Sequence, residues 1–266
     1  MTLRPRPTPS FVAGAAISLT KPFTPSTLKT IKSALQHRSG QANNALTHPS
    51  SNKHHAGVLI PFCNIGGEPG ILLEVRAKSL RSHSGEISFP GGRVDETDGS
   101  VLNAALRETY EELGIESDRI EILGEVGPPQ INLRGDMTVW PYVGFVHATK
   151  KDAIRLSDDE PFPSLDIEDI RRRISLAEVA AALHLPLKHF ASPSRVRTSF
   201  YRNQEPYYPI DVTDIARSAL KEEGVITTKT GETEDEVGPG VDGRVEVWGL
   251  TGWYVTLLMK ALHVYQ

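Results

Sequence analysis

Three glutamates at helical spacing form the part of this chain that is best suited to chemistry. Glu108, Glu111 and Glu112 stand at positions i, i+3 and i+4, so on a helix their carboxylates share one face. Carboxylates gathered in this way repel one another unless a cation neutralises them. Their hard oxygen atoms suit Mg²⁺ or Mn²⁺, and magnesium keeps waters and substrate phosphates beside a few protein ligands. The spacing therefore predicts a site for Mg²⁺ or Mn²⁺.

The residues around the glutamates distinguish such a site from an ordinary acidic helix face, which the glutamate pattern alone would also fit. Arg107 stands one turn before Glu111, where its guanidinium can hold that carboxylate. The turn at Gly91 and Gly92 brings bare backbone close to the helix, so a carbonyl can join the cation ligands. The predicted cation ligands are Glu108, Glu112, Glu111 and Gly91.

This segment resembles the Nudix box, G-x5-E-x7-R-E-U-x-E-E-x-G-U, in which U is a bulky apolar residue. The box positions are occupied by Gly92, Arg107, Glu108, Thr109, Glu111, Glu112, Gly114 and Ile115. The chain departs from the pattern at Asp98, which replaces the first glutamate and is separated from Arg107 by eight residues instead of seven. Thr109 is also less apolar than usual. The resemblance implies an α/β (α+β) fold in which helices sandwich a mixed β-sheet, and hydrolysis of a nucleoside diphosphate linked to another group. It also implies that the catalytic residues are Glu111, Glu112 and Arg107.

The residues upstream of the box resemble the coenzyme A diphosphatase branch of the same family. That branch shows L-L-T-x-R-[S/A]-x3-R-x3-G-x3-F-P-G-G, and residues 72–92 follow it except that Glu74 replaces the threonine. The branch commonly has the longer box as well. The resemblance implies metal-dependent cleavage of coenzyme A and its derivatives into adenosine 3′,5′-bisphosphate and 4′-phosphopantetheine. Arg76, Arg81 and His83 precede the catalytic turn, where they could bind substrate phosphates.

The proton acceptor and the substrate are open at this point. Glu111 is either a third cation ligand or the base that takes the proton of the attacking water, and a base from a distant loop would be Glu178, Glu160 or Asp159. Two other functions also fit the box. One is a sanitising pyrophosphatase for oxidised nucleotides or other nucleoside diphosphate derivatives. The other is a catalytically silent Nudix domain that senses a ligand, although such a domain is expected to have lost its glutamates.

The surrounding sequence predicts the elements that position these residues. Apolar runs bounded by turn residues indicate strands, and apolar stripes with capping residues indicate helices. The expected strands are 58–62, 71–75, 86–89, 119–126, 138–147, 196–201 and 245–248. The expected helices are 26–36 capped by Ser26, 100–113 ended by Gly114, 175–183 capped by Ser175 and stopped by Pro186, and 251–262 capped by Thr251.

Length and composition indicate an ordinary globular protein. The chain has 266 residues, of which 39% are hydrophobic and 23% charged. Cys63 is the single cysteine, so an internal disulfide is excluded and a reducing compartment is expected. We expect a flexible basic leader at 1–23 and one domain at 24–266. Acidic stretches interrupt that domain at 152–169 and, as a loop insertion, at about 222–244.

The charge is distributed unevenly along the chain. Residues 1–67 contain seven Lys or Arg and no Asp or Glu, so the net charge of −4 leaves −11 on residues 68–266. An acid-free N-terminus of this kind is typical of an organelle transit peptide or of a disordered basic leader. With the family's eukaryotic members often peroxisomal or mitochondrial, we expect an intracellular protein of the mitochondrion or peroxisome. The expected partner is a small-molecule substrate, with no nucleic acid and no membrane span, and the protein is expected to be a monomer or homodimer.

Overall fold

A computed structural model describes residues 14–38, 54–80, 83–132, 134–151, 155–202, 205–220 and 243–266. Arg81, most of the predicted leader and the centre of the predicted insertion lie outside these ranges. The helices are α1 (Pro25–Arg38), α2 (Val101–Leu113), α3 (Ile167–Arg173), α4 (Thr213–Leu220) and α5 (Gly249–Ala261). The strands are β1 (His55–Ile65), β2 (Glu68–Arg76), β3 (Ile87–Ser88), β4 (Gly91–Arg93), β5 (Ile120–Glu125), β6 (Gln130–Ile131), β7 (Thr138–Val146), β8 (Val179–Pro186), β9 (Ser199–Tyr201), β10 (Glu205–Tyr207), β11 (Ile210–Asp211) and β12 (Glu246–Val247).

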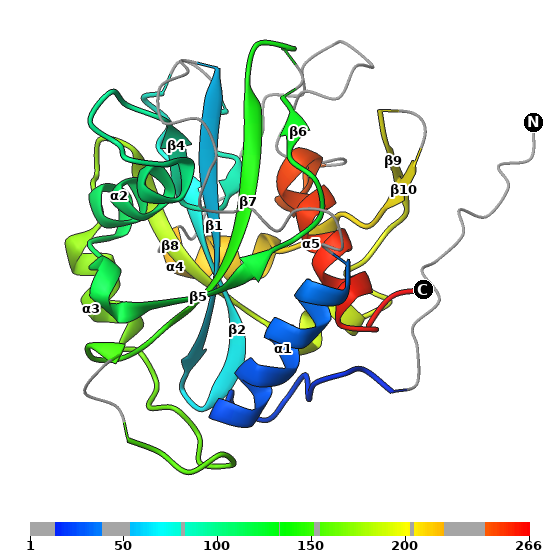
Figure 1. Cartoon of the computed structure of the whole chain (residues 1–266). Helices are drawn as coiled ribbons and strands as arrows, with labels where there is room; N and C mark the ends of the chain where they lie inside the picture. The colour runs from blue at the N-terminus through cyan, green and yellow to red at the C-terminus, as the bar shows by residue number, and fades with distance from the viewer. Residues whose placement is uncertain are drawn as a thin grey trace, which may run out of the picture.

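A mixed sheet runs through the middle of the molecule (Figure 1). Its strand order is β3-β2-β1-β7-β5, with β4 beside β1, β6 beside β7, and β8 beside β2. β1 and β7 run parallel, whereas the other pairs in this sheet are antiparallel. A parallel pair needs a connection that passes over the sheet. The chain between β1 and β7 contains α2, which therefore lies on one face of the sheet.

Helices cover both faces of the sheet, as Figure 1 shows. Side chains alternate along a strand, so Leu72 and Leu73 of β2 belong to opposite cores. Leu72 packs in the core that α2 and α3 cover, together with Ala105 and Ile170. Leu73 packs in the larger core that α1, α4 and α5 cover. The predicted sandwich of a mixed sheet between helices is confirmed.

The predicted elements that lead into the glutamate helix are confirmed. β1 and β2 form the expected hairpin, with its turn at Gly66 and Gly67. The glutamate helix begins after Ser100, whose side chain accepts a hydrogen bond from the Asn103 N–H. It ends at Gly114, which has a left-handed φ of 65°.

The helix predicted at 175–183 is wrong, because residues 176–178 form a turn and residues 179–183 begin strand β8. Its alanine-rich sequence favours a helix by local propensity. In the fold it pairs with β2 over Gly70–Arg76, and its side chains alternate between the two cores: Leu183 lies in one and Ala182 in the other. Pairing and burial thus outweigh local propensity. The neighbouring helix is α3, which lies at the end of the stretch expected to be an acidic interruption.

Two predicted helix caps are also wrong. Ser26 lies inside α1, and the side chain of Thr24 accepts the hydrogen bond from the Thr27 N–H at 3.2 Å. α1 therefore begins with proline at its first position, where a missing N–H costs nothing. Thr251 lies inside α5, which begins after Trp248 without a side-chain cap.

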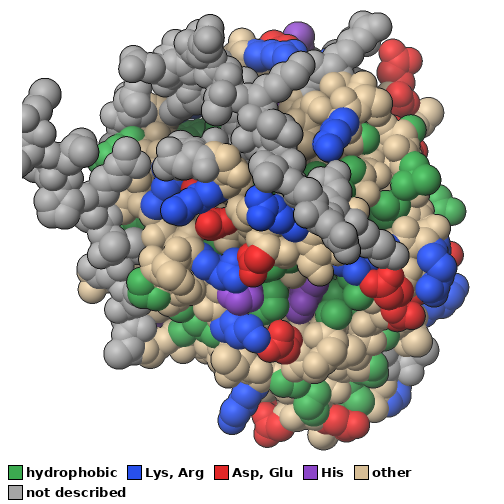
Figure 2. All heavy atoms as spheres, turned by 180° about the vertical axis from the view of Figure 1, so that it is seen from behind, with side chains coloured by type: hydrophobic (Ala, Val, Ile, Leu, Met, Phe, Trp, Pro, Cys, Tyr) green, Lys and Arg blue, Asp and Glu red, His purple; other side chains and the backbone are tan. Residues whose placement is uncertain are grey.

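The described surface carries charges of both signs. Figure 2 shows the face behind the view of Figure 1, where Lys and Arg side chains are interspersed with Asp and Glu. Within the described ranges, no helix combines the length and the apolar character needed to cross a membrane.

Candidate metal centre

Two glycines allow β4 to approach α2 closely. Gly91 has φ 150°, and a Cβ on it would lie 2.3 Å from the carbonyl oxygen of Gly57. A Cβ on Gly92 would lie 2.4 Å from the carboxyl carbon of Glu108. A side chain at either position would collide with β1 or with the glutamate. The glycine turn therefore brings its backbone directly against the carboxylates of α2.

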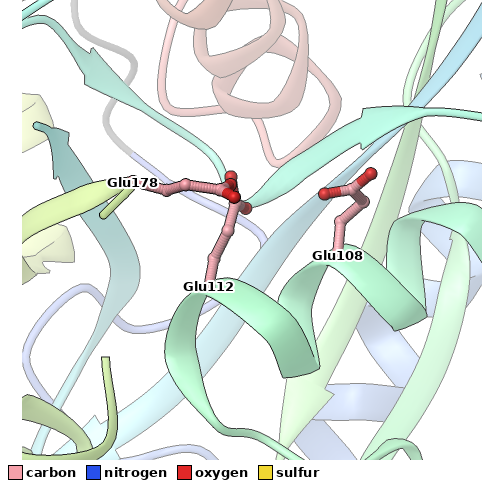
Figure 3. A group of neighbouring side chains, drawn as sticks. All are labelled: Glu108, Glu112 and Glu178. Carbon is pink, nitrogen blue, oxygen red and sulfur yellow. The ribbon is translucent and has the colours of Figure 1, made fainter. Parts of the chain in front are cut away.

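Three carboxylates converge beside this turn. Glu108, Glu112 and Glu178 each offer an oxygen atom, and these atoms all lie within 4.8 Å of one another. The first two project from successive turns of α2, and Glu178 reaches them from the residue before β8 (Figure 3). The backbone of Glu178 is fixed to the end of β2, since its carbonyl accepts a hydrogen bond from the Ala77 N–H at 2.8 Å.

Burial makes this group electrostatically unfavourable on its own. Glu112 is 2% exposed, and the Gly91 N–H donates to its Oε2 at 2.8 Å. Burial, followed by the nearby charge of Glu74, raises the pKa of Glu112 well above its ordinary value. Burial also raises the pKa of Glu108. Buried carboxylates become stable as anions when a cation neutralises them, so the geometry and the hard oxygen donors of this group fit a divalent metal ion.

Arg107 connects the loop before α2 with the glutamates on it. Its Nε and Nη2 donate to the two carboxylate oxygens of Asp98 at 3.0 and 2.9 Å. Its Nη1 donates to Glu108 at 3.0 Å and to Glu111 at 2.9 Å. These contacts raise the pKa of Arg107, chiefly through Asp98. The guanidinium of Arg107 therefore holds Glu108, one of the three converging carboxylates, by a hydrogen bond.

The two departures from the box pattern have structural explanations. Asp98 is buried and holds Arg107 by two parallel hydrogen bonds, so it orients the arginine and not the cation. Thr109 is fully buried in the wall of α2, where its hydroxyl donates to the Ala105 carbonyl at 2.7 Å. The family box usually has an apolar residue here, and this hydrogen bond satisfies the hydroxyl group that threonine adds to the buried position.

Glu111 and the other candidate bases lie apart from the three converging carboxylates. Glu111 is 52% exposed and is held by Arg107. Asp159 accepts a hydrogen bond from Ser26 of α1, and Glu160 accepts one from the Ser157 N–H. Of the residues considered for the base, the structure brings only Glu178 into the described cluster. The carbonyl of Gly91 stays a prediction, because the contact found for Gly91 is made by its N–H.

The predicted phosphate-binding residues differ in their distance from the cluster. Arg76 Nη1 lies 3.8 Å from Glu112 Oε1 and so faces the carboxylates. His83 is more than half exposed, and its Nδ1 lies 2.9 Å from the carboxylate of Glu86. Arg81 lies outside the described residues. Arg76 is thus the one whose described position adjoins the cluster.

Sequence reasoning assigned no role to Glu74, which lies beside the cluster. It is 0% exposed, and burial is the main cause that raises its pKa. Ser88 donates to its Oε1 at 3.0 Å, and Arg76 Nη1 lies 3.5 Å from the same oxygen. The signal in the sequence was a charged residue within the apolar run 71–75, since fully buried carboxylates are rare unless they are paired.

Comparison with known proteins identifies a family for much of the chain. The model of the family described as NUDIX domain matches residues 53–194. The chain is 35% identical over 161 residues to the uncharacterized Nudix hydrolase NudL of Enterobacter sp. (strain 638), covering 60% of this chain and 66% of that protein. It is 45% identical over 101 residues to NudL of Salmonella paratyphi B, covering 38% of this chain and 51% of the relative. A MutT/nudix family protein from Enterococcus faecalis of known crystal structure is 19% identical with a TM-score of 0.33, over 60% of this chain and 52% of that one.

The bacterial relatives correct the predicted compartment. Enterobacter and Salmonella have neither mitochondria nor peroxisomes, so their NudL proteins are not targeted to organelles. The mitochondrial or peroxisomal location expected from the basic N-terminus is therefore contradicted. A stretch without acidic residues is a compositional feature, and composition by itself does not identify a receptor-read targeting signal.

Proposed function

The chain belongs to the Nudix family, and from this premise we propose that it is a Mg²⁺- or Mn²⁺-dependent diphosphatase of coenzyme A and its derivatives. The observation that carries the proposal is the convergence of Glu108, Glu112 and Glu178 within 4.8 Å. The catalytically silent alternative expects lost glutamates, whereas here the carboxylates are present and supported by Arg107 and the Gly91 N–H. The chain spans 66% and 51% of the lengths of the two NudL relatives, so their activity is part of the proposal.

The proposed reaction is hydrolysis of the P–O–P linkage. The oxygen of water bonds to one phosphorus, the bridging P–O bond breaks, and the other phosphate leaves with the bridging oxygen. Coenzyme A and water would thus give adenosine 3′,5′-bisphosphate and 4′-phosphopantetheine. When bound between the carboxylates, a divalent cation supplies charge neutralisation and acidification of water.

Each residue of the centre has a proposed task. Glu108 and Glu112 would hold the cation, because they are the two least exposed of the three carboxylates. A carboxylate oxygen of Glu178 would accept the proton of the attacking water, since this side chain is exposed and points to the same place (Figure 3). Glu111, which Arg107 already holds, would orient that arginine. Arg76 would attract the substrate diphosphate, with Arg81 and His83 as further phosphate contacts.

Coenzyme A as the substrate is supported by sequence. Residues 72–92 resemble the motif of the coenzyme A branch apart from Glu74, and Arg76 of that motif faces the carboxylate cluster. The names of the NudL relatives state a family and no substrate. Substrate identity therefore has to be decided by assay.

The test is product analysis with the full chain. The protein is incubated with coenzyme A and either Mg²⁺ or Mn²⁺, and the products are separated by liquid chromatography and identified by mass. We expect adenosine 3′,5′-bisphosphate and 4′-phosphopantetheine, loss of both in EDTA, and loss of both in Glu112→Gln. Glu68→Gln serves as the matched control, because Glu68 pairs with Lys188 at the far end of β2.

The alternatives give different results in the same assay. Cleavage of an oxidised nucleoside triphosphate without cleavage of coenzyme A would replace the proposed substrate with the sanitising one. If neither compound is cleaved at any cation concentration, the silent domain becomes the better description.

A further inference from the structure

Glu74 occupies a position from which it can contact the carboxylate cluster. It lies on β2 two residues from Leu72, so both side chains project towards the face that α2 covers. Arg76 Nη1 lies 3.5 Å from Glu74 Oε1 and 3.8 Å from Glu112 Oε1. One guanidinium nitrogen therefore lies between an oxygen of Glu74 and an oxygen of Glu112, which places Glu74 immediately beside the cluster.

The second oxygen of Glu74 is buried and unused. Oε1 receives the hydrogen bond from Ser88 and faces Arg76. Oε2 has no hydrogen-bond partner among the described residues, although the whole residue is 0% exposed. A buried carboxylate oxygen without a partner carries a large desolvation cost. A ligand that reaches Oε2 when the centre is complete would offset that cost.

The charge balance of the centre indicates which kind of ligand this is. Glu108, Glu112 and Glu178 already gather negative charge, and Glu74 adds another carboxylate. Arg76 is the described cation that lies next to both Glu74 and Glu112, whereas Arg107 is engaged with Asp98, Glu108 and Glu111. Two guanidinium groups, one of which is shared with Asp98 and Glu111, cannot neutralise these four carboxylates. The unused oxygen therefore fits a cation better than an anion or a hydrogen-bond acceptor.

We propose that Glu74 adds its carboxylate, through Oε2, to the divalent-cation site that Glu108 and Glu112 form, with Arg76 fixing its position relative to Glu112. This inference rests on the proposed function, because it requires that the cluster binds metal. Glu74 replaces a threonine and is the one departure from the upstream motif. The inference gives this departure a part in metal binding. A threonine hydroxyl has no charge and would add little to cation affinity.

Calorimetric titration of the EDTA-stripped full chain with Mn²⁺ tests the inference without relying on activity. We expect Glu74→Gln and Glu74→Thr to raise the Mn²⁺ dissociation constant by about 10- to 100-fold, the range seen when residues that support metal ligands are removed. Glu68→Gln, on the same strand but paired with Lys188, should bind as the unmodified chain does. Circular dichroism of each variant in EDTA establishes that it is folded, and electron paramagnetic resonance of free Mn²⁺ gives a second measure of binding.

Each outcome bears on a different claim. Gln can still accept hydrogen bonds from Ser88 and Arg76, so a Glu74→Gln protein with unchanged Mn²⁺ affinity would reduce Glu74 to a positioning role and overturn the inference. If Glu112→Gln loses Mn²⁺ binding in that same experiment, the proposed function stands. If the unmodified chain binds no Mn²⁺, the proposed function fails and the inference fails with it.

Discussion

Arg107 and Asp98 meet edge to edge, with Nε 3.0 Å from Oδ1 and Nη2 2.9 Å from Oδ2. Asp98 is also where the chain departs from the spacing of the family box. Nη1 of Arg107 is left to hold Glu108 and Glu111. Asp98, in the loop before α2, therefore fixes the position of Arg107, and Arg107 in turn fixes Glu108 and Glu111 on α2.

We predict that Arg107→Lys weakens both stability and metal binding. A lysine cannot make two parallel hydrogen bonds to one carboxylate, and a hydrogen bond to a charged group contributes about 1.5–3 kcal/mol. Urea unfolding in EDTA should therefore show a loss of about 2 kcal/mol. Arg172→Lys is the matched control, because Arg172 forms a surface pair with Asp169 of the kind that contributes little. Equal losses in the two variants would contradict the assigned role of Arg107.

We predict that Gly92→Ala removes activity while the protein stays folded. The added methyl would lie 2.4 Å from the Glu108 carboxyl carbon, so the glutamate has to move. Misplacement of a reacting or orienting group by about 1 Å costs about 100-fold in rate. Gly99→Ala lies between β4 and α2, where the added methyl meets only the Asn103 side chain at 3.3 Å, and it should keep most of the activity. Rates of product formation and the circular dichroism spectrum of both variants provide the check.

Metal binding is expected to release protons. Burial raises the pKa of Glu108 and of Glu112 above ordinary values, so these groups hold protons in the metal-free protein at pH values where exposed glutamates do not. A cation displaces those protons, and its apparent affinity should rise with pH. Mn²⁺ titration calorimetry in two buffers of different ionisation enthalpy measures the number released. Glu112→Gln should release fewer, and a heat that is independent of the buffer would refute the prediction.

The stability of the protein should fall in mild acid because of His184. Burial lowers the pKa of His184 to about 4 from an ordinary 6.5, so the fold favours the neutral ring. Its contribution is fully present above pH 6.5 and decreases as the pH falls through about 4, by a few kcal/mol in total. Unfolding free energies measured between pH 7 and pH 4 should show a shallower decline in His184→Gln. Parallel declines in the two proteins would exclude His184 as the cause.

Local sequence patterns were sufficient to predict the glutamate helix and its surroundings. The helix start near Ser100, the Gly114 terminator and the strand–turn–strand segment of β1 and β2 depend on interactions between near neighbours. Capping, turn formation and apolar periodicity act over a few residues. For the same reason the ion pair between Arg107 and Glu111, one turn apart, could be predicted and is found.

Local patterns failed where distant segments decide the outcome. The alanine-rich segment before Pro186 has the local propensity of a helix. It forms a strand because it pairs with β2 and buries its side chains in the cores on both faces of the sheet. Thr24 takes the place of Ser26 as the cap of α1 because the exact start of a helix depends on one turn of geometry. The first error has a tertiary cause, since tertiary contacts contribute more free energy than the small differences in local propensity. The second is local, because Thr24 and Thr27 lie within one turn of each other.

The sequence by itself determined the family, the mixed sheet between helices, and the presence of Glu108 and Glu112 on one helix. Only the tertiary structure decided which carboxylates meet: it brings Glu178 from before β8 to the cluster, leaves Glu111 with Arg107, and buries Glu74 beside Glu112. Strands β5, β6 and β7 and helix α3 separate Glu178 from Glu112 along the chain, so no local pattern records that they are close in space. Electrostatic interaction depends on distance in space, so the composition of the site emerged only with the fold.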